Sequence, residues 1–267
     1  MSRVPNNFFV NYSFLLNCNE LRQFSLSQCY WVLSVRYNGA DQNSPMIRTQ
    51  AVSEPKKAPE ALPIQEVKIL LQDASHFQGQ AQQAFFPESE AQIAQILRQT
   101  QQDRIPITIS GAGTGVTGSR VPQGGKILST ERLNKILKID WDGRSPEGTV
   151  TVEPGVSLEV LEEALKKQGL FYPPNPGEKK AFLGGTVATN ASGGRSFKYG
   201  STRSFVEGLR VLLPNGDLLE LHRGKTKARE GNFTFQFSDG RIAVATLPTY
   251  TLPQTKHAAG YFTKRQM

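Results

Sequence analysis

The sequence contains few of the residues that build disulfides, metal centres or nucleophilic triads. Its 267 residues include two cysteines, Cys18 and Cys29, and three histidines, His76, His222 and His257. The cysteines lack the short spacing of a zinc knuckle or a redox CxxC motif, and the histidines are scattered along the chain. We therefore expect reduced bystander cysteines, no metal site and no Ser-His-Asp triad.

Long apolar runs are also missing. Even the stretch from Phe8 to Leu16 is interrupted by Asn11 and Ser13, so it is unsuited to cross a membrane. The first residues lack the longer apolar core and small-residue cleavage site of a secretory signal. The sequence therefore predicts a cytoplasmic protein without a membrane span.

The charge is moderately basic and evenly spread. Lys and Arg total 31 and Asp and Glu total 23, which gives a net charge of +8. No basic helix or known reading motif accompanies this charge, so we expect no nucleic-acid partner. A small ligand that carries phosphate accounts for the same balance.

The composition divides the chain into three parts. Residues 1–60 combine Asn, Ser and aromatic residues without steady periodicity and end in a linker-like stretch, so we expect a poorly structured extension there. The abrupt change suggests the hypothesis that the biological start is Met46. We expect one domain over residues 61–250, and an unstructured or truncated tail over residues 251–267.

Periodicity within the middle part predicts a mixture of helices and strands. One helix is expected over residues 88–102, and a second begins at the N-cap Ser157, buries Leu158, Leu161 and Leu165, and stops at Gly169. The expected strands are residues 105–109, 126–129, 136–139 and 149–152, followed by hairpins over 209–221 and 233–245. The fold class is therefore α+β.

Two glycine-rich segments, residues 111–118 and 184–194, carry the strongest functional signal. Glycine has no Cβ, so several backbone N–H groups can gather around an anion. Two such segments in one domain indicate a long phosphorylated ligand bound at two places. A dinucleotide cofactor fits this description.

The first segment formally matches GxGxxG at residues 113–118, but its context is wrong for a Rossmann fingerprint. That motif must open a helix, whereas Pro122, Gly124 and Gly125 follow here. A Walker loop requires Lys before Ser or Thr, and this chain has Ser119-Arg120. Two interpretations remain: an anion-binding nest assisted by the Thr114 hydroxyl, or a turn that is rich in glycine for tight packing.

Three segments in order, residues 105–115, 152–157 and 184–200, resemble a known family. They are similar to the FAD-binding domain of the vanillyl-alcohol oxidase / p-cresol methylhydroxylase (PCMH-type) family. The nearest branch contains D-lactate dehydrogenases and the FAD-binding subunit of glycolate oxidase. The resemblance covers about residues 60–250 and implies an α+β fold of two α/β subdomains that binds FAD.

The resemblance also implies residue roles. Residues 110–115 would wrap the pyrophosphate through backbone N–H groups, and Thr114 and Thr117 would add hydroxyl donors. Pro174 and the implied residues of the second segment would lie near the ribityl chain and flavin ring. Attachment should be non-covalent, because the first loop has Thr114 where some relatives carry a linking His. The implied cofactor-binding residues are Ser110, Gly111, Ala112, Gly113, Thr114, Gly115, Thr117, Gly118, Pro174, Gly184, Gly185, Ala188, Asn190, Ser192, Gly194, Tyr199 and Gly200.

Two of these residues have an alternative interpretation that concerns structure alone. Asn190 is also typical of a turn residue whose side chain bonds its own backbone. Tyr199 is as well suited to core packing as to a flavin contact.

Members of this family continue into another Gly-rich segment and a cap domain that supplies substrate-binding and catalytic residues. The sequence ends at Met267 without either, so we expect a truncated FAD fold and assign no catalytic residue. The resemblance implies an FAD-dependent oxidoreductase that oxidises a 2-hydroxy acid or alcohol by hydride transfer to flavin N5. A partner chain would supply the missing half, or the protein would be poorly soluble. The alternative is a non-catalytic remnant, or a nucleotide- or phosphate-binding module without flavin.

Overall fold

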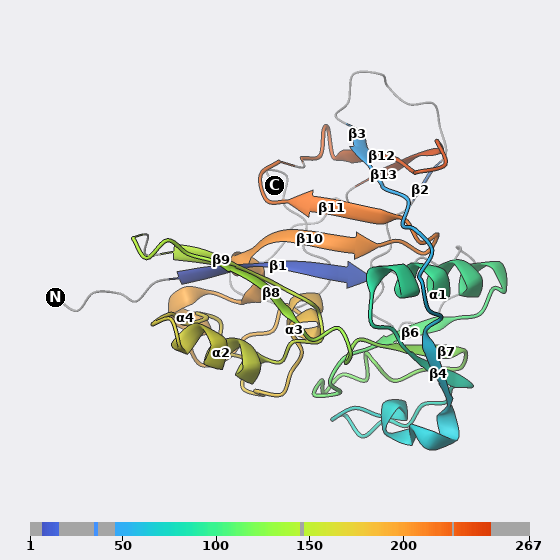
Figure 1. The fold of residues 1–267 in the computed structure, drawn as a ribbon, viewed down its shortest axis with the longest axis horizontal. Helices are drawn as coiled ribbons and strands as arrows, with labels where there is room; N and C mark the ends of the chain where they lie inside the picture. The colour runs from blue at the N-terminus through green and yellow to red at the C-terminus, as the bar shows by residue number, and fades with distance from the viewer. Residues whose placement is uncertain (1–6, 16–34, 37–45, 145–146, 226, 247–267) are drawn as a thin grey trace.

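The computed structural model describes residues 7–15, 35–36, 46–144, 147–225 and 227–246. Within these residues the strands form three sheets, with short helices on their faces (Figure 1). The strands are β1 (Asn7–Leu15), β2 (Val35–Arg36), β3 (Met46–Arg48), β4 (Glu60–Pro63), β5 (Gln83–Phe86), β6 (Ile107–Ser110), β7 (Lys126–Ser129), β8 (Ile136–Asp140), β9 (Glu147–Val152), β10 (Val206–Leu212), β11 (Leu218–His222), β12 (Asn232–Gln236) and β13 (Ile242–Thr246). The helices are η1 (Ile64–Glu66), η2 (Lys68–Leu71), α1 (Glu90–Gln102), α2 (Leu158–Lys166), α3 (Leu183–Ala188), α4 (Ser196–Tyr199) and η3 (Thr202–Phe205).

The sheet with strand order β4-β5-β7-β6 carries the first glycine segment, and we call it the loop-bearing sheet. Strands β6 and β7 are parallel, with Ile107 opposite Lys126 and Ser110 opposite Ser129. Because the carboxyl ends of parallel strands meet at one edge of a sheet, the segments that follow Ser110 and Ser129 lie side by side. This edge positions the candidate site.

Helix α1 joins the loop-bearing sheet to the rest of the molecule. Its N-cap Ser89 accepts a hydrogen bond from the Gln92 backbone N–H at 3.3 Å, which satisfies one free donor of the first turn. The buried face of α1 then packs against both β6–β7 and the β10–β11 hairpin. The residues of this cluster are Ile93, Ala94, Ile96, Leu97, Ile107, Leu128, Leu133, Leu212 and Leu218.

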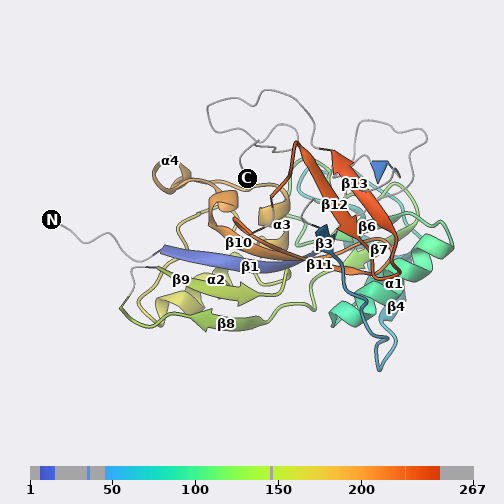
Figure 2. The same cartoon turned by 90° about the horizontal axis from the view of Figure 1, so that it is seen from above.

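A five-stranded sheet, ordered β11-β10-β1-β9-β8, forms the second part. Helix α2 lies on its β8–β9 side, as Figures 1 and 2 show from two directions. Ser157 caps α2 by accepting from the Val160 N–H at 3.3 Å. The fully buried Leu158, Leu161 and Leu165 pack with residues of β9 and α3 in one cluster, as the leucine spacing predicts.

Strand β1 lies between β9 and β10 and is parallel to both. Sequence analysis expected no element there, because residues 7–15 have no steady periodicity. Backbone pairing on both sides, and not a local pattern, defines this strand. Residues 46–48 likewise pair with β12 in the third sheet, ordered β2-β13-β12-β3. The boundaries 1–60 and 61–250 and the Met46 hypothesis stay predictions, and the tail 251–267 lies outside the described residues.

The expected helices at 88–102 and after Ser157, and both expected hairpins, are present within two or three residues of the predicted ends. Helix α3 was not expected, because it has two glycines in its first turn.

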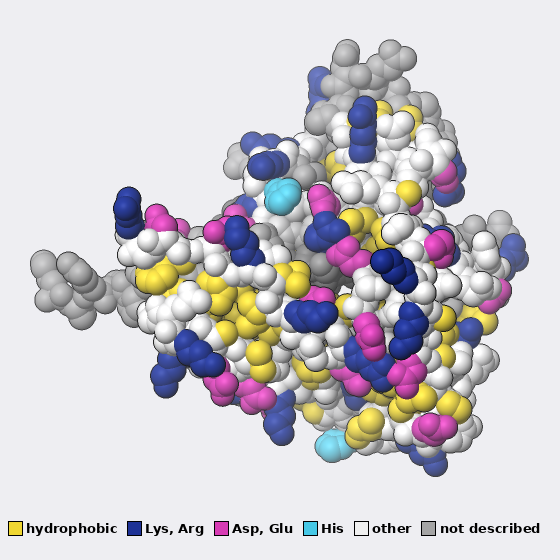
Figure 3. Space-filling view, viewed as in Figure 1, with side chains coloured by type: hydrophobic (Ala, Val, Ile, Leu, Met, Phe, Trp, Pro, Cys, Tyr) yellow, Lys and Arg dark blue, Asp and Glu magenta, His cyan; other side chains and the backbone are white. Residues whose placement is uncertain are grey.

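No helix among the described residues is long and apolar enough to cross a membrane. On the face drawn in Figure 3, Lys and Arg side chains are interspersed with Asp and Glu and form no patch of one sign.

Asp217 fastens the third sheet to the β10–β11 hairpin. Its buried carboxylate accepts hydrogen bonds from the Thr49 hydroxyl at 2.6 Å, the Ser238 N–H at 2.8 Å and the Ser238 hydroxyl at 2.6 Å. Burial alone would raise the pKa of Asp217, but these hydrogen bonds outweigh burial and leave the pKa below its ordinary value of 3.8. The ionised form is therefore favoured in the folded protein.

We expect Leu161→Ala to lower the free energy of unfolding by about 2–5 kcal/mol, because it leaves a cavity in the core under α2. The matched control is its neighbour Val160→Ala, since Val160 is 46% exposed and should change stability by less than about 0.5 kcal/mol. Urea denaturation followed by circular dichroism measures both. Equal losses for the two variants would contradict the packing described here.

We expect Asp217→Asn to make the free energy of unfolding less dependent on pH in the acidic range. Because the folded pKa of Asp217 is lowered, its carboxylate stabilises the fold above the ordinary pKa, and this contribution is lost as pH falls through the folded pKa. The stability difference between wild type and Asp217→Asn should therefore be largest near neutral pH and shrink below about pH 4. Urea midpoints measured from neutral pH to about pH 2 test this, and a constant difference would refute it.

Candidate functional site

The first glycine segment leaves β6 with its carbonyl groups turned toward the protein. The Ser110 carbonyl accepts from the Thr130 N–H at 3.0 Å, and the Gly113 carbonyl accepts from the Ala74 N–H at 3.0 Å. The Gly111 carbonyl accepts from Arg120 Nη1 at 2.8 Å. In a trans peptide the C=O and the following N–H point in opposite directions, so the N–H groups that follow these carbonyls point away from the protein contacts.

Those N–H groups form a run of unused donors. Among the described residues, the backbone N–H groups of residues 111–115 have no hydrogen-bond acceptor. The hydroxyls of Thr114 and Thr117 have none in this part of the chain either, and Thr117 is exposed. Consecutive N–H donors on a glycine loop make an anion-binding nest.

Geometry separates the glycines of this segment into two groups. Gly113 has φ +77°, and a Cβ on it would lie 2.4 Å from Arg120 Cζ. Gly118 has φ +71°, and a Cβ on it would lie 2.7 Å from the Phe77 ring. The fold itself therefore requires glycine at these two positions. At Gly111 and Gly115 a Cβ would meet nothing closer than 4.0 Å and 3.8 Å, so packing does not account for glycine there.

The second glycine segment divides in the same way. A Cβ on Gly184 would lie 2.8 Å from the Pro154 side chain, and one on Gly193 would lie 1.7 Å from the Asn175 carbonyl. Gly185 and Gly194 are exposed, and a Cβ on either would meet nothing within 4 Å. An open surface without side chains is what a flat ligand needs in order to approach the backbone.

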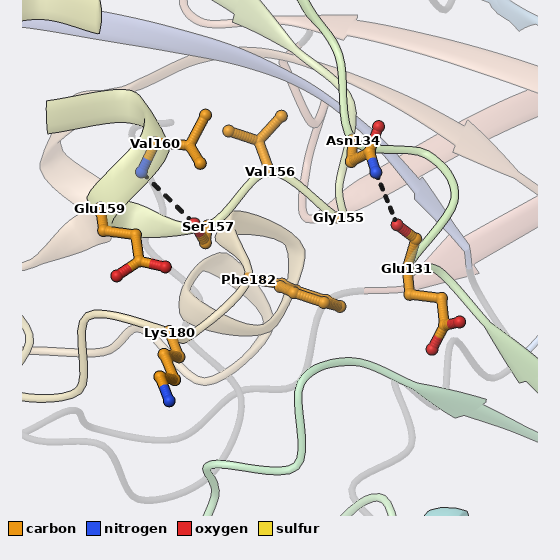
Figure 4. Close-up of a pocket in the computed structure, with 9 residues that line it drawn as sticks. All are labelled: Glu131, Asn134, Gly155, Val156, Ser157, Glu159, Val160, Lys180 and Phe182. Carbon is orange, nitrogen blue, oxygen red and sulfur yellow. Dashed lines mark hydrogen bonds between the residues drawn. The ribbon is translucent and has the colours of Figure 1, made fainter. Parts of the chain in front are cut away.

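The structure brings the two segments together through Phe182. A Cβ on Gly111 would lie 4.0 Å from the Phe182 ring, and Phe182 is the residue immediately before α3. Its ring extends into a cavity of 570 Å³ between the start of α2 and the loop after β7 (Figure 4). The lining residues are Glu131, Asn134, Gly155, Val156, Ser157, Glu159, Val160, Lys180 and Phe182.

None of these nine lining residues was among the predicted site residues. Residues 152–157 contributed to the resemblance, but no side chain there was given a role. An aromatic residue two positions before Gly184 is the one signal that could have drawn attention to Phe182.

Several predicted site residues have structural partners. Buried Asn190 has φ +49°, and its Oδ1 accepts from the Arg203 N–H at 2.9 Å, which ties the end of α3 to η3. Tyr199 packs edge-on against Phe171, with ring centroids 5.8 Å apart. Gly200 has φ +93° and ends α4. Asn190 thus bonds the backbone of Arg203 and not its own, and Tyr199 packs against an aromatic ring. The cofactor roles of both residues stay predictions.

The remaining predicted residues lie in or beside the second segment. Ala188 is exposed, Ser192 is half-buried, and Pro174 is buried in the turn that packs against this segment, where Pro176 pairs with Gly193. The cofactor roles of these three residues also stay predictions.

The nest has a positive charge beneath it. Burial lowers the pKa of the Arg120 guanidinium, and the nearby Asp73 and Glu131 carboxylates partly offset this effect. An arginine nevertheless stays charged at neutral pH.

No group of three or more His, Cys, Asp or Glu side chains that could hold a metal occurs among the described residues. Cys18, Cys29 and His257 lie outside them.

Residues 81–222, more than half of the chain, match the family of the FAD binding domain. The chain belongs to this family. The predicted family, the α+β fold class and FAD as the family's cofactor are thereby confirmed.

Curated relatives agree with this family. The chain is 38% identical over 162 residues to a D-lactate dehydrogenase of Anaerostipes hadrus, an alignment that covers 59% of this chain and 33% of the relative. It is 34% identical over 188 residues to glycolate oxidase subunit GlcD of Bacillus subtilis, which covers 67% of this chain and 39% of that protein. The chain spans less than half the length of these relatives.

Solved structures show the same fold. An alkyldihydroxyacetonephosphate synthase superposes with a TM-score of 0.55 at 20% identity, over 84% of this chain and 49% of the other. A 6-hydroxy-D-nicotine oxidase from Arthrobacter nicotinovorans gives a TM-score of 0.55 at 18% identity, over 65% of this chain and 38% of the other.

We expect Gly185→Leu to weaken FAD binding about tenfold or more without lowering stability. The leucine would cover the open surface of α3, yet leucine favours a helix more than glycine does by about 0.5–1 kcal/mol. The matched control is Gly177→Leu, because Gly177 is also exposed and open but lies in the preceding turn. Titration with FAD and thermal melting of the apoprotein measure the two effects. Unchanged FAD affinity in Gly185→Leu would contradict this assignment.

Proposed function

We propose that this chain binds FAD non-covalently across its two glycine segments and forms the flavin-binding part of an oxidoreductase for a 2-hydroxy acid or alcohol. The observation that carries the proposal is the run of backbone N–H groups at residues 111–115, which have no acceptor among the described residues. Those of Gly111, Ala112 and Thr114 also follow carbonyls that the protein holds, so they point away from these contacts. A pyrophosphate is the part of FAD that needs such donors.

The residues present fit the whole dinucleotide. The pyrophosphate is central in FAD, so its two halves extend in different directions from the nest. The cavity beside Phe182 offers an aromatic face and backbone walls to one half, and the open surface at Gly185 and Gly194 offers room to the other. The first loop has Thr114 and no histidine, which by the family resemblance supports non-covalent attachment.

When bound, FAD would supply the two-electron acceptor of the reaction, with flavin N5 as the position that receives hydride. The role of this chain is to bind and orient. Residues 111–115 would hold the phosphates, and Phe182 and α3 would exclude water from one side of the cofactor. No described side chain is assigned a proton-transfer role.

The substrate class is proposed from the relatives. D-lactate and glycolate, which occur in their names, are both 2-hydroxy acids, and a third relative is a D-2-hydroxyglutarate dehydrogenase. The chain spans 33–39% of these proteins. From the family resemblance alone, we propose a partner chain that supplies substrate-binding residues. The cytoplasmic location stays a prediction from the sequence.

The proposal is tested with the purified full chain. After incubation with FAD and removal of free cofactor, we expect the protein to retain the absorbance bands of oxidised flavin. ADP should compete with FAD, because it carries the same pyrophosphate, and riboflavin should bind much more weakly. Acid precipitation should release the flavin into the supernatant.

Other outcomes decide between the alternatives. A colourless protein that still binds ADP in calorimetry would indicate a nucleotide-binding module without flavin. A protein that binds neither would indicate a remnant. Flavin that stays with the acid-precipitated protein would overturn the non-covalent assignment.

A further inference from the structure

Arg120 lies between the first glycine segment and the η2 segment, and its guanidinium is fully engaged by both. On the glycine side, Nη1 donates to the Ser110 hydroxyl at 3.1 Å and to the Gly111 carbonyl at 2.8 Å. On the η2 side, Nε donates to the Gln72 carbonyl at 3.0 Å, and Nη2 donates to the carbonyls of Gln72 and Ile69 at 2.6 and 2.9 Å. A guanidinium has five N–H donors, so none is left for another partner.

This arrangement excludes one role and supports another. Arg120 cannot donate a hydrogen bond to a bound phosphate without breaking a contact with the protein. It can fix the direction of a peptide group, because holding the Gly111 carbonyl turns the Ala112 N–H to the opposite side. The guanidinium also lies directly against Gly113, where a Cβ would be 2.4 Å from Arg120 Cζ.

The charge of Arg120 matters because Asp73 lies close by. Asp73 is 6% exposed, and its Oδ2 has no hydrogen-bond partner among the described residues. This oxygen lies 3.8 Å from the Cβ position of Gly115, at the edge of the nest. A buried carboxylate repels a phosphate at this range unless a cation offsets it. Arg120 forms no ion pair within 4.0 Å in the described part of the chain, so its charge is available to do so.

We propose that Arg120 is a positioning residue of the FAD site, which turns the donors of the glycine nest toward the pyrophosphate and offsets the charge of Asp73. This inference rests on the proposed function. Its chemistry is specific to a planar cation with five donors, which lysine cannot replace fully.

The test measures FAD affinity by titration and apoprotein stability by thermal melting in five chains. These are wild type, Arg120→Gln, Arg120→Lys, the double variant Arg120→Gln/Asp73→Asn, and the control Arg98→Gln. Arg98 also donates to a backbone carbonyl, that of Val52, and pairs with Glu54, but it lies on α1 away from the nest.

We expect Arg120→Gln to weaken FAD binding about thirtyfold or more, and Arg120→Lys to weaken it less, because lysine keeps the charge. The double variant should recover at least about threefold of the affinity lost in Arg120→Gln, since it removes the uncompensated carboxylate. Arg98→Gln should bind FAD like wild type even where its melting temperature falls.

The outcomes separate this inference from the function on which it rests. Failure of wild type to bind FAD would overturn the proposed function. Wild-type binding with unchanged affinity in Arg120→Gln would overturn the positioning role alone. If the double variant recovers none of the affinity lost in Arg120→Gln, the proposal that Arg120 offsets the charge of Asp73 is refuted. If Arg120→Gln does not fold, Arg120→Lys decides, because affinity equal to wild type would again refute a role that needs five donors.

Discussion

The candidate site depends on the engagement of three backbone carbonyls at the start of the first glycine segment. Thr130, Arg120 and Ala74 hold the carbonyls of Ser110, Gly111 and Gly113, and the planar peptide bond transmits that constraint to the N–H groups that follow. Parallel pairing of β6 with β7 is what brings Thr130 beside Ser110. The nest is thus a product of sheet register and one half-buried cation, Arg120, and glycine content only permits it.

The two glycine segments contribute different physical properties. The first supplies unpaired donors and a positive charge, which suit an anion. The second supplies open backbone on a short helix, which suits a flat surface. Phe182 joins them, because its ring lies 4.0 Å from the Cβ position of Gly111 and the residue directly precedes α3. The buried leucines of α2 pack with residues of β9 and α3, and this packing fixes the position of the junction.

Much of the fold was predictable where one element carries its own pattern. The apolar stripe and Ser89 cap of α1, the leucines and Ser157 cap of α2, and the Pro214-Asn215-Gly216-Asp217 turn are local signals. Strand β1 and helix α3 have no such signal: β1 is defined by its neighbours, and α3 has two glycines in its first turn. In both cases tertiary contacts outweigh local propensity.

The site was predictable as a region but not in its detail. The order of motifs identified the family, yet the sequence cannot distinguish Gly113, which the fold requires, from Gly115, which it does not. In the sequence Arg120 is only a residue that breaks a Walker motif, because its role depends on carbonyls of residues 69 and 72 that only the fold brings near. Phe182 was missed because its position beside Gly111 also depends on the fold.

The position of β1 couples distant parts of the chain during folding. Asn7 pairs with Glu147 and Val10 pairs with Val206, so the first strand depends on partners that lie far along the sequence. The β8–β9 and β10–β11 pairs can close early as local hairpins, but each keeps an unpaired edge until β1 inserts between them. Completion of this sheet is therefore a high-contact-order step, expected to be slow and to require that most of the chain has already left the ribosome.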